Sequence, residues 1–325
     1  MEYAELGTTG VEISRIVLGC GNFGGIGSAP ELFGRGESDD EAAALMDAAW
    51  EAGITTFDTA DAYGGGRSET YIGDWLRTQP TEVRHSVQLA TKVFNPMGPG
   101  DPGGLAPGRI RRQLESSLER LGVERVELYL THAPDPEVPL AETLAALGKL
   151  QRSGHVGHVG ASNVDGAVLS EALELAGSDG LARYEWVQNE YSLLAREAER
   201  DVLPLAVRHG LGFTPFSPLS GGWLTGKYRR DEEPPAGSRM TLRPEPYEHL
   251  RSEETFAALE RFEAAAAARG VEPAALAIAW LLAQPGVTAV VIGPRRPEQI
   301  APALRALELD LSPADADEVA ALFPT

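Results

Sequence analysis

Four side chains that can hold or move a proton follow short apolar segments of the chain. Asp58 and Tyr63 lie in one run, Lys92 ends the next apolar segment, and His132 ends a later one. A tyrosine phenol titrates at about pH 10, so it is a poor acid at neutral pH unless a neighbouring ammonium lowers its pKa. We therefore expect Lys92, held by the Asp58 carboxylate, to lower the pKa of Tyr63, and His132 to orient a carbonyl oxygen.

This set of residues suits proton transfer to an oxygen that is becoming an alkoxide. No cluster of metal ligands accompanies it, and we expect no metal site. The spacing of His155 and His158 could suit a metal, but no carboxylate accompanies them. We expect Asp61 to be a hydrogen-bonding loop residue rather than a second acid. If a carbonyl is reduced here, the hydride must come from a bound cofactor.

Eight short apolar segments alternate with longer segments of helical periodicity. The expected strands cover residues 15–18, 55–58, 87–91, 127–131, 155–161, 186–189, 212–216 and 289–292. Ser38 and Glu41 form a capping box, and Pro273 stands at a plausible first helical position. Eight strands in one chain predict a single α/β domain over residues 1–325, a (β/α)8 barrel.

The alternative fold is a doubly wound open sheet. Residues 19–24 contain a G-x-G-x-x-G pattern, but no helical pattern begins there, so the barrel is favoured. Residues 3–6 and 11–14 predict a small hairpin outside the barrel. Residues 95–107 and 229–247 are rich in proline and glycine or charge and predict long loops, which in barrels shape the site.

A barrel enzyme builds its site from the carboxyl ends of its strands, so these residues are expected to converge on one mouth. The residues that end or follow the expected strands are mostly polar groups or glycines: Gly21, Asn22, Asp58, Asp61, Tyr63, Lys92, His132, Ser162, Asn163, Gln188, Asn189, Phe216, Ser217, Gly293 and Arg295.

Charge and composition exclude several classes of partner. The formal net charge of −20 argues against nucleic acid and anionic membranes, because both require a basic surface. Cys20 is the single cysteine, and no apolar run approaches the roughly 20 residues of a membrane span. The first residues lack the features of a signal peptide, so we expect a cytoplasmic protein. Its only lysines are Lys92, Lys149 and Lys227.

The chain resembles the aldo-keto reductases along essentially its whole length. The segments that carry the resemblance are FDTADAYGGGRSE from residue 57, LATK ending at Lys92, LYLTHAPD from residue 128, VGASN ending at Asn163, VQNEYSLL from residue 187, PFSPLSGGWLTGKY from residue 215 and VIGPRRPEQI from residue 291. Their pattern is most similar to the bacterial and potassium-channel-β-subunit-like branch.

The resemblance implies a role for each matching residue. Asp58, Tyr63, Lys92 and His132 match the family's catalytic tetrad, with Tyr63 as the general acid. Ser162, Asn163 and Gln188 match residues that bind the nicotinamide carboxamide, and Phe216 matches a ring that stacks on the nicotinamide. The remaining matches are residues that hold the phosphates and adenosine: Ser217, Pro218, Leu219, Gly221, Lys227, Arg239, Gly293, Arg295 and Gln299, with Gly21 and Asn22 beside them at the mouth.

Two departures bear on the cofactor. Pro302 and Ala303 stand where the family usually has Glu and Asn against adenine, and Pro294 replaces a frequent small or hydroxyl residue. Because Arg295 could still pair with a 2′-phosphate, NADP(H) is favoured, with NAD(H) as the alternative.

The resemblance implies NADPH-dependent reduction of aldehydes or ketones. An NAD-dependent dehydrogenase of sugars and a low-turnover, cofactor-sensing regulatory subunit are the alternatives. The expected partner is a small carbonyl or sugar substrate, and the oligomeric state is left open.

Overall fold

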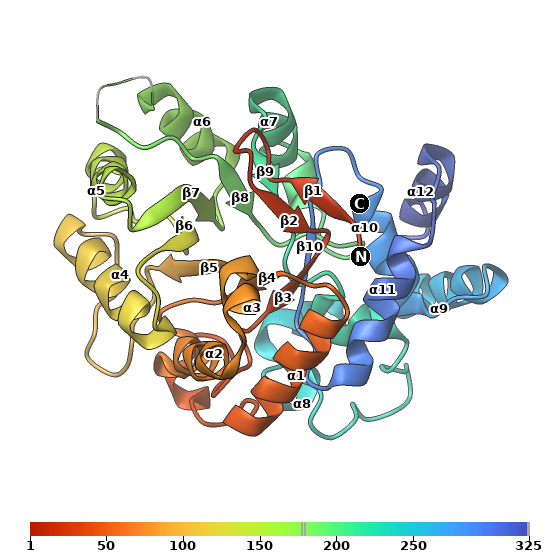
Figure 1. Cartoon of the computed structure of the whole chain (residues 1–325). Helices are drawn as coiled ribbons and strands as arrows, with labels where there is room; N and C mark the ends of the chain where they lie inside the picture. The colour runs from red at the N-terminus through yellow and green to blue at the C-terminus, as the bar shows by residue number, and fades with distance from the viewer. Residues whose placement is uncertain (177, 179, 324–325) are drawn as a thin grey trace.

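A computed structural model describes residues 1–176, 178 and 180–323. Its centre is an eight-stranded parallel sheet in the order β10-β3-β4-β5-β6-β7-β8-β9, which curls into a barrel (Figure 1). The strands are β3 (Ile16–Gly19), β4 (Thr56–Asp58), β5 (Gln88–Val93), β6 (Val126–Thr131), β7 (Val156–Ser162), β8 (Trp186–Gln188), β9 (Gly212–Phe213) and β10 (Val290–Ile292). All eight predicted strands are present, and the predicted (β/α)8 fold is confirmed.

Helices between the strands surround the barrel. They are α1 (Asp39–Glu51), α2 (Arg67–Thr78), α3 (Thr81–Ser86), α4 (Pro107–Leu121), α5 (Leu140–Arg152), α6 (Gly166–Leu175), α7 (Val202–His209), α8 (Arg239–Leu242), α9 (Glu253–Ala268), α10 (Pro273–Leu282), α11 (Ala301–Leu307) and α12 (Pro313–Ala320). The predicted capping box of Ser38 and Glu41 begins α1, and Pro273 begins α10. Helix α4 ends at Leu121 and is followed by Gly122, whose φ of 69° suits a glycine.

Backbone hydrogen bonds join the two ends of the sheet. The amide of Thr288 donates to the carbonyl of Phe213 at 2.8 Å, and the amide of Val291 donates to the carbonyl of Pro215 at 3.0 Å. The prediction that the strand continues to residue 216 is wrong, because β9 ends at Phe213. Pro215 has no amide hydrogen to donate to a ladder. Only an isolated parallel bridge, between Glu190 and Phe216, follows.

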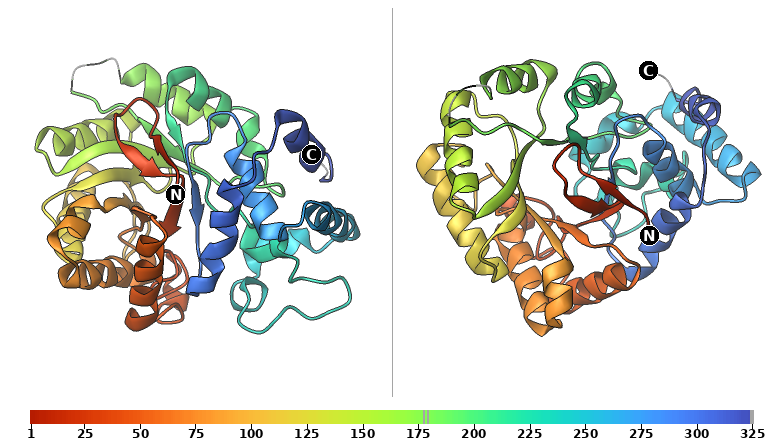
Figure 2. Two further views of the ribbon diagram at one scale, coloured as in Figure 1. Left: turned by 45° about the vertical axis from the view of Figure 1, so that its right-hand side comes forward. Right: turned by 45° about the horizontal axis from the view of Figure 1, so that its top comes forward.

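The predicted N-terminal hairpin is also present. Strands β1 (Tyr3–Glu5) and β2 (Glu12–Ser14) pair with each other in a separate antiparallel sheet. They lie across the end of the barrel at which the strands begin (Figures 1 and 2). Leu6 and Ile13 are buried against side chains of the barrel interior, including Leu128 and Trp186. The hairpin therefore closes one end of the barrel and leaves the carboxyl ends of the strands as the mouth.

Residues 217–288 form much more than one barrel helix. After a 3-10 segment, η4 (Ser220–Thr225), the chain forms the short helix α8 and a second 3-10 segment, η5 (Glu245–Leu250), before α9 and α10. Trp223 is buried, and its ring packs against the rings of Tyr228 and Phe256. Trp223 thus anchors this long segment by its packing.

No single helix among the described residues has both the length and the apolar character needed to cross a membrane. Helices α9 and α10 reach those limits only when taken together, and they meet at an angle of 89°.

We predict that truncation of the hairpin's apolar contact destabilises the whole barrel. Leu6 has no exposed surface, and its side chain lies against the backbone of Gly212. Leu6→Ala should therefore lower the free energy of unfolding by about 2–5 kcal/mol in urea denaturation. The matched control is Val207→Ala, on the exposed side of α7, which should change it by less than about 0.5 kcal/mol. Equal effects of the two changes would contradict the role of the hairpin.

Candidate active site

The alternation of side chains along the strands places the polar residues inside the barrel. In β4, Phe57 packs against the surrounding helices, so its neighbour Asp58 faces the interior. In β5, Ala90 belongs to the interior cluster, and Lys92 lies on the same face two residues later. Because Asp58 is paired in register with Ala90, the carboxylate and the ammonium meet near the mouth.

A buried ion pair lies at the centre of this mouth. The Nζ atom of Lys92 donates to Oδ1 of Asp58 at 2.5 Å and to the carbonyl of Thr59 at 2.9 Å, and it lies 3.4 Å from the hydroxyl of Tyr63. Lys92 has no exposed surface and Asp58 has 3%. Gln188, from β8, donates to the second carboxylate oxygen of Asp58 at 2.8 Å. Ammonium and carboxylate are thus both supplied with polar partners.

The acidity of Tyr63 differs from the sequence-based expectation. Burial of the phenol raises the pKa of Tyr63, and the Lys92 ammonium offsets only part of that effect. The expected net lowering of the pKa is therefore wrong, because removal from water costs the phenolate more than one neighbouring cation returns. Burial also opposes the charge of Lys92, but Asp58 and Tyr63 together outweigh it, so the pKa of Lys92 lies above its usual value. At neutral pH, Tyr63 carries its proton and Lys92 its charge.

His132 approaches Tyr63 from the next strand end. Its Nε2 atom lies 3.3 Å from the Tyr63 hydroxyl, and the two rings meet edge to face. Burial and the nearby Lys92 ammonium hold the pKa of His132 well below its usual value, so the imidazole is neutral at neutral pH. The Asn95 side chain lies 3.0 Å from its Nδ1 atom.

The loops that follow β7 and β9 are tightly bent. Asn163, Ser217 and Ser220 all have positive φ, with values of 55°, 53° and 44°. The Asn163 amide donates to the carbonyl of His132 and to the hydroxyl of Ser162, which connects the ends of β6 and β7. Non-glycine residues adopt this conformation at some cost, and such strain is common at ligand-binding loops.

A glycine turn lies beside Lys227. Gly222 has a φ of 96°, which favours glycine, and a Cβ atom there would lie 2.2 Å from the Lys227 Nζ atom and displace the ammonium. Partial burial and the guanidinium groups of Arg239 and Arg295 lower the pKa of Lys227. Three cations of a strongly acidic protein are therefore gathered on one side of the mouth.

The partners of these cations differ. Arg239 donates to the side-chain oxygen of Asn22 at 3.0 Å. Among residues 1–176, 178 and 180–323, no carboxylate forms an ion pair with Arg239 or Lys227. Unpaired cations beside a glycine turn provide the donor chemistry that a pyrophosphate requires. The residues present thus fit the phosphates of a nicotinamide dinucleotide.

Arg295 has a partner that sequence reasoning missed. Its Nε atom donates to Glu37 at 2.6 Å, and its Nη1 atom donates to the carbonyl of Gly237 at 2.9 Å. Glu37 is 3% exposed, and burial raises its pKa against the opposing effect of Arg295. The backbone amide of Arg295 donates to the side chain of Gln299 at 2.8 Å. Glu37 precedes a capping box in the sequence, and nothing in that context indicates a partner across the barrel mouth.

The Aldo/keto reductase family model matches residues 15–323. The chain belongs to the aldo/keto reductase family. It is an NAD(P)-dependent oxidoreductase, and the resemblance given by the sequence motifs is confirmed.

Related proteins match this chain over nearly its whole length. An uncharacterized oxidoreductase, YrpG, of Bacillus subtilis is 39% identical over 96% of this chain and 92% of its own length. A probable voltage-gated potassium channel subunit beta of rice is 33% identical over 99% of this chain and 96% of its own length. An NADH-specific methylglyoxal reductase of Escherichia coli is 33% identical over 97% of this chain and 96% of its own length.

Two expectations for titratable side chains are wrong. Asp61 is fully buried, and neither carboxylate oxygen has a hydrogen-bond partner among the described residues, so it is not a hydrogen-bonding loop residue. Burial and the nearby Glu69 raise the pKa of Asp61 well above its usual value. His158 does have a carboxylate neighbour, because the pairing of β7 with β8 brings Glu185 within 2.9 Å of its Nδ1 atom.

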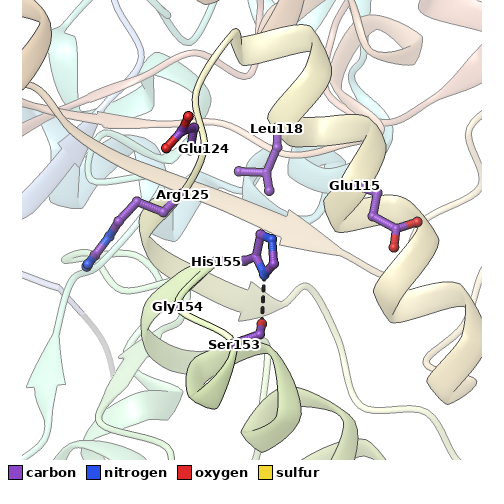
Figure 3. Close-up of a pocket in the computed structure, with 7 residues that line it drawn as sticks. All are labelled: Glu115, Leu118, Glu124, Arg125, Ser153, Gly154 and His155. Carbon is purple, nitrogen blue, oxygen red and sulfur yellow. Dashed lines mark hydrogen bonds between the residues drawn. The ribbon is translucent and has the colours of Figure 1, made fainter.

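A surface hollow of about 560 Å³ lies away from the mouth (Figure 3). It is lined by Glu115, Leu118, Glu124, Arg125, Ser153, Gly154 and His155, close to the residues at which β6 and β7 begin. Sites of barrel enzymes lie at the carboxyl ends of the strands, so this hollow is not the candidate active site.

Within the described part of the chain, no group of three His, Cys, Asp or Glu side chains is arranged so that it could hold a metal ion.

We predict that the Lys92–Asp58 pair is strongly coupled. Asp58→Asn should lower the free energy of unfolding by about 3–5 kcal/mol, because it leaves a buried ammonium without its counter-ion. Adding Lys92→Met to this variant removes the unpaired charge and should restore part of the loss. Urea denaturation of Asp58→Asn, Lys92→Met and the double variant measures the coupling. Arg111→Gln, which breaks an exposed pair with Glu115, is the control and should change stability by less than about 1 kcal/mol. Additive effects of the two buried substitutions would contradict the coupling.

Proposed function

We propose that this aldo/keto reductase reduces aldehydes or ketones to alcohols, with Tyr63 as the acid that protonates the carbonyl oxygen. The observation that carries the proposal is the position of the Tyr63 hydroxyl, within 3.4 Å of the Lys92 ammonium and 3.3 Å of the His132 imidazole. The hydride added to the carbonyl carbon would come from a reduced nicotinamide bound at the mouth. The names of relatives that are called reductases support the same direction of reaction.

The proton step uses the electrostatics of the mouth. The O–H bond of Tyr63 breaks as its proton bonds to the substrate oxygen, and a phenolate remains on Tyr63. Lys92 stabilises that phenolate, while Asp58 keeps Lys92 charged and in position. The raised pKa of Tyr63 ensures that the acid is loaded with its proton at neutral pH.

We propose NADPH as the favoured cofactor, held by residues on the basic side of the mouth. Lys227, Arg239 and the turn around Ser217 would hold the pyrophosphate, and Arg295 would approach the 2′-phosphate. Glu37 opposes that last contact, since it already neutralises Arg295. NADH is the alternative, and one relative is named as NADH-specific.

Tyr63→Phe should fold and bind cofactor but lose activity. Loss of the general acid should reduce kcat by about 100-fold to 10,000-fold, measured on a panel of aldehydes and ketones with NADPH and with NADH. Cofactor binding, followed by fluorescence titration, should change little, because the phenol is the group removed. Retained kcat would contradict the proposed acid.

The same panel separates the two alternatives. Sugars oxidised with NAD, and no carbonyl reduced, would indicate an aldose dehydrogenase. Tightly retained cofactor and negligible turnover of every compound would indicate a regulatory subunit, a role suggested by the name of the rice relative.

Glu37→Gln should raise the preference for NADPH. Glutamine keeps the hydrogen bond to Arg295 but removes the negative charge, so the ratio of NADPH to NADH affinity should rise about tenfold, equivalent to about 1.4 kcal/mol. Both dissociation constants are measured by fluorescence titration without substrate. Glu298→Gln, which alters the exposed pair with Arg296, is the matched control and should leave the ratio unchanged. An unchanged ratio in the Glu37 variant would show that Arg295 does not meet the 2′-phosphate.

A further inference from the structure

The imidazole of His132 has a different polar neighbour at each nitrogen. Nε2 lies 3.3 Å from the Tyr63 hydroxyl, and Nδ1 lies 3.0 Å from the side-chain nitrogen of Asn95. A neutral imidazole carries a single N–H, and the partner of one nitrogen decides which nitrogen carries it. The contact with Asn95 therefore bears directly on what His132 presents to Tyr63.

Asn95 is held from several directions. Its side-chain nitrogen also donates to the Ser28 hydroxyl at 3.2 Å, so the same nitrogen contacts both Ser28 and His132. Its backbone carbonyl accepts from Arg109 at 2.9 Å, and Arg109 is paired with Asp101 at 2.6 Å. The loop after β5 thus presents a fixed amide to the imidazole.

Tyr63 receives donors from two sides if Asn95 donates to Nδ1. Lys92 already donates toward the phenolic oxygen. With Nδ1 accepting from Asn95, the proton of His132 is on Nε2, and this N–H also points to the phenolic oxygen. Both lone pairs of that oxygen are then occupied, and the phenolic hydrogen is left for the substrate.

The other tautomer would do the opposite. An Nε2 atom without a hydrogen would accept the phenolic proton of Tyr63 and direct it away from the substrate. It would also remove a donor that could stabilise the phenolate after proton transfer. The position of one hydrogen on His132 therefore decides whether Tyr63 is ready to act.

We propose that Asn95 is a positioning residue that, by donating to Nδ1, keeps the proton of His132 on Nε2 and so aims the phenolic proton of Tyr63 at the substrate. This inference rests on the proposed role of Tyr63 as the acid. Asn95 itself touches His132, and its effect on the reaction passes through that ring.

Asn95→Asp is the decisive variant. A carboxylate accepts from Nδ1–H instead of donating, so it should move the proton of neutral His132 from Nε2 to Nδ1. Nitrogen-15 NMR of ring-labelled histidine reports the tautomer, and loss of one signal in His132→Gln assigns it among the six histidines. We expect an Nε2–H tautomer in the native enzyme and an Nδ1–H tautomer in the variant at pH 9.

The pH dependence of the variant provides a second readout. The native imidazole stays neutral because its pKa is lowered, so kcat/KM for reduction should be flat from about pH 6 to 9. A carboxylate beside Nδ1 raises the pKa of His132, and below that pKa the imidazolium again donates from Nε2. For Asn95→Asp, kcat/KM should therefore fall as the pH rises through the new pKa, to about 10-fold to 100-fold below native.

Two further variants keep the test sharp. Asn95→Ala, which adds no buried charge, should give a mixture of tautomers and an intermediate loss of kcat/KM, with cofactor affinity unchanged. Ser28→Ala removes the other partner of the amide but not its contact with His132, and it should retain the native tautomer and activity.

The outcomes distinguish this inference from the proposed function. An Nδ1–H tautomer in the native enzyme, or an unchanged Nε2–H tautomer in Asn95→Asp, would overturn the inference while leaving the role of Tyr63 to its own test. A tautomer change in Asn95→Asp together with full turnover by Tyr63→Phe would overturn the proposed acid, and with it the catalytic part of the inference.

Discussion

The ion pair between Lys92 and Asp58 is the interaction on which the rest of the mouth depends. An ammonium without exposed surface is tolerable only with a counter-ion and further acceptors, and Asp58 and the Thr59 carbonyl provide them. Once charged and fixed, Lys92 acts on both of its neighbours. It offsets part of the burial penalty at Tyr63, and it helps to keep His132 neutral. One buried cation thus lowers the pKa of both adjacent rings, although burial keeps Tyr63 protonated while His132 is neutral.

The protein has a net charge of −20, yet one side of its mouth is positively charged because a few cations cluster there. Arg239 and Arg295 lie close enough to lower the pKa of Lys227, and Arg295 also lowers the pKa of Arg239. Most of the negative charge, in contrast, belongs to exposed side chains that water and salt screen. Glu37 is the exception, a buried carboxylate among these cations. The balance between Glu37 and Arg295 is a local matter that net charge does not reveal.

The sequence was sufficient for the features that depend on periodicity. Short apolar runs between helical segments predicted the eight strands, and the polar residues at the strand ends, such as Asp58 and Lys92, were correctly predicted to meet. Contacts made by loops escaped prediction, because a loop's path has no periodic signal. Glu37 and Asn95 reach the mouth from such segments. The direction of the Tyr63 pKa shift was also missed, since it depends on how far burial outweighs a neighbouring charge, and that balance requires coordinates.

The seam between β9 and β10 has a consequence for the motion of this barrel. Only two residues form β9, and the bonds from Thr288 and Val291 that close the sheet join segments about 75 residues apart in the chain. Because few hydrogen bonds hold this seam and the segment between its two sides is long, we expect the barrel to open transiently here. The strained turn at Ser217 leaves the barrel at this same edge. Breathing of the seam would therefore loosen one wall of the mouth, while the buried ion pair on the far strands keeps its geometry.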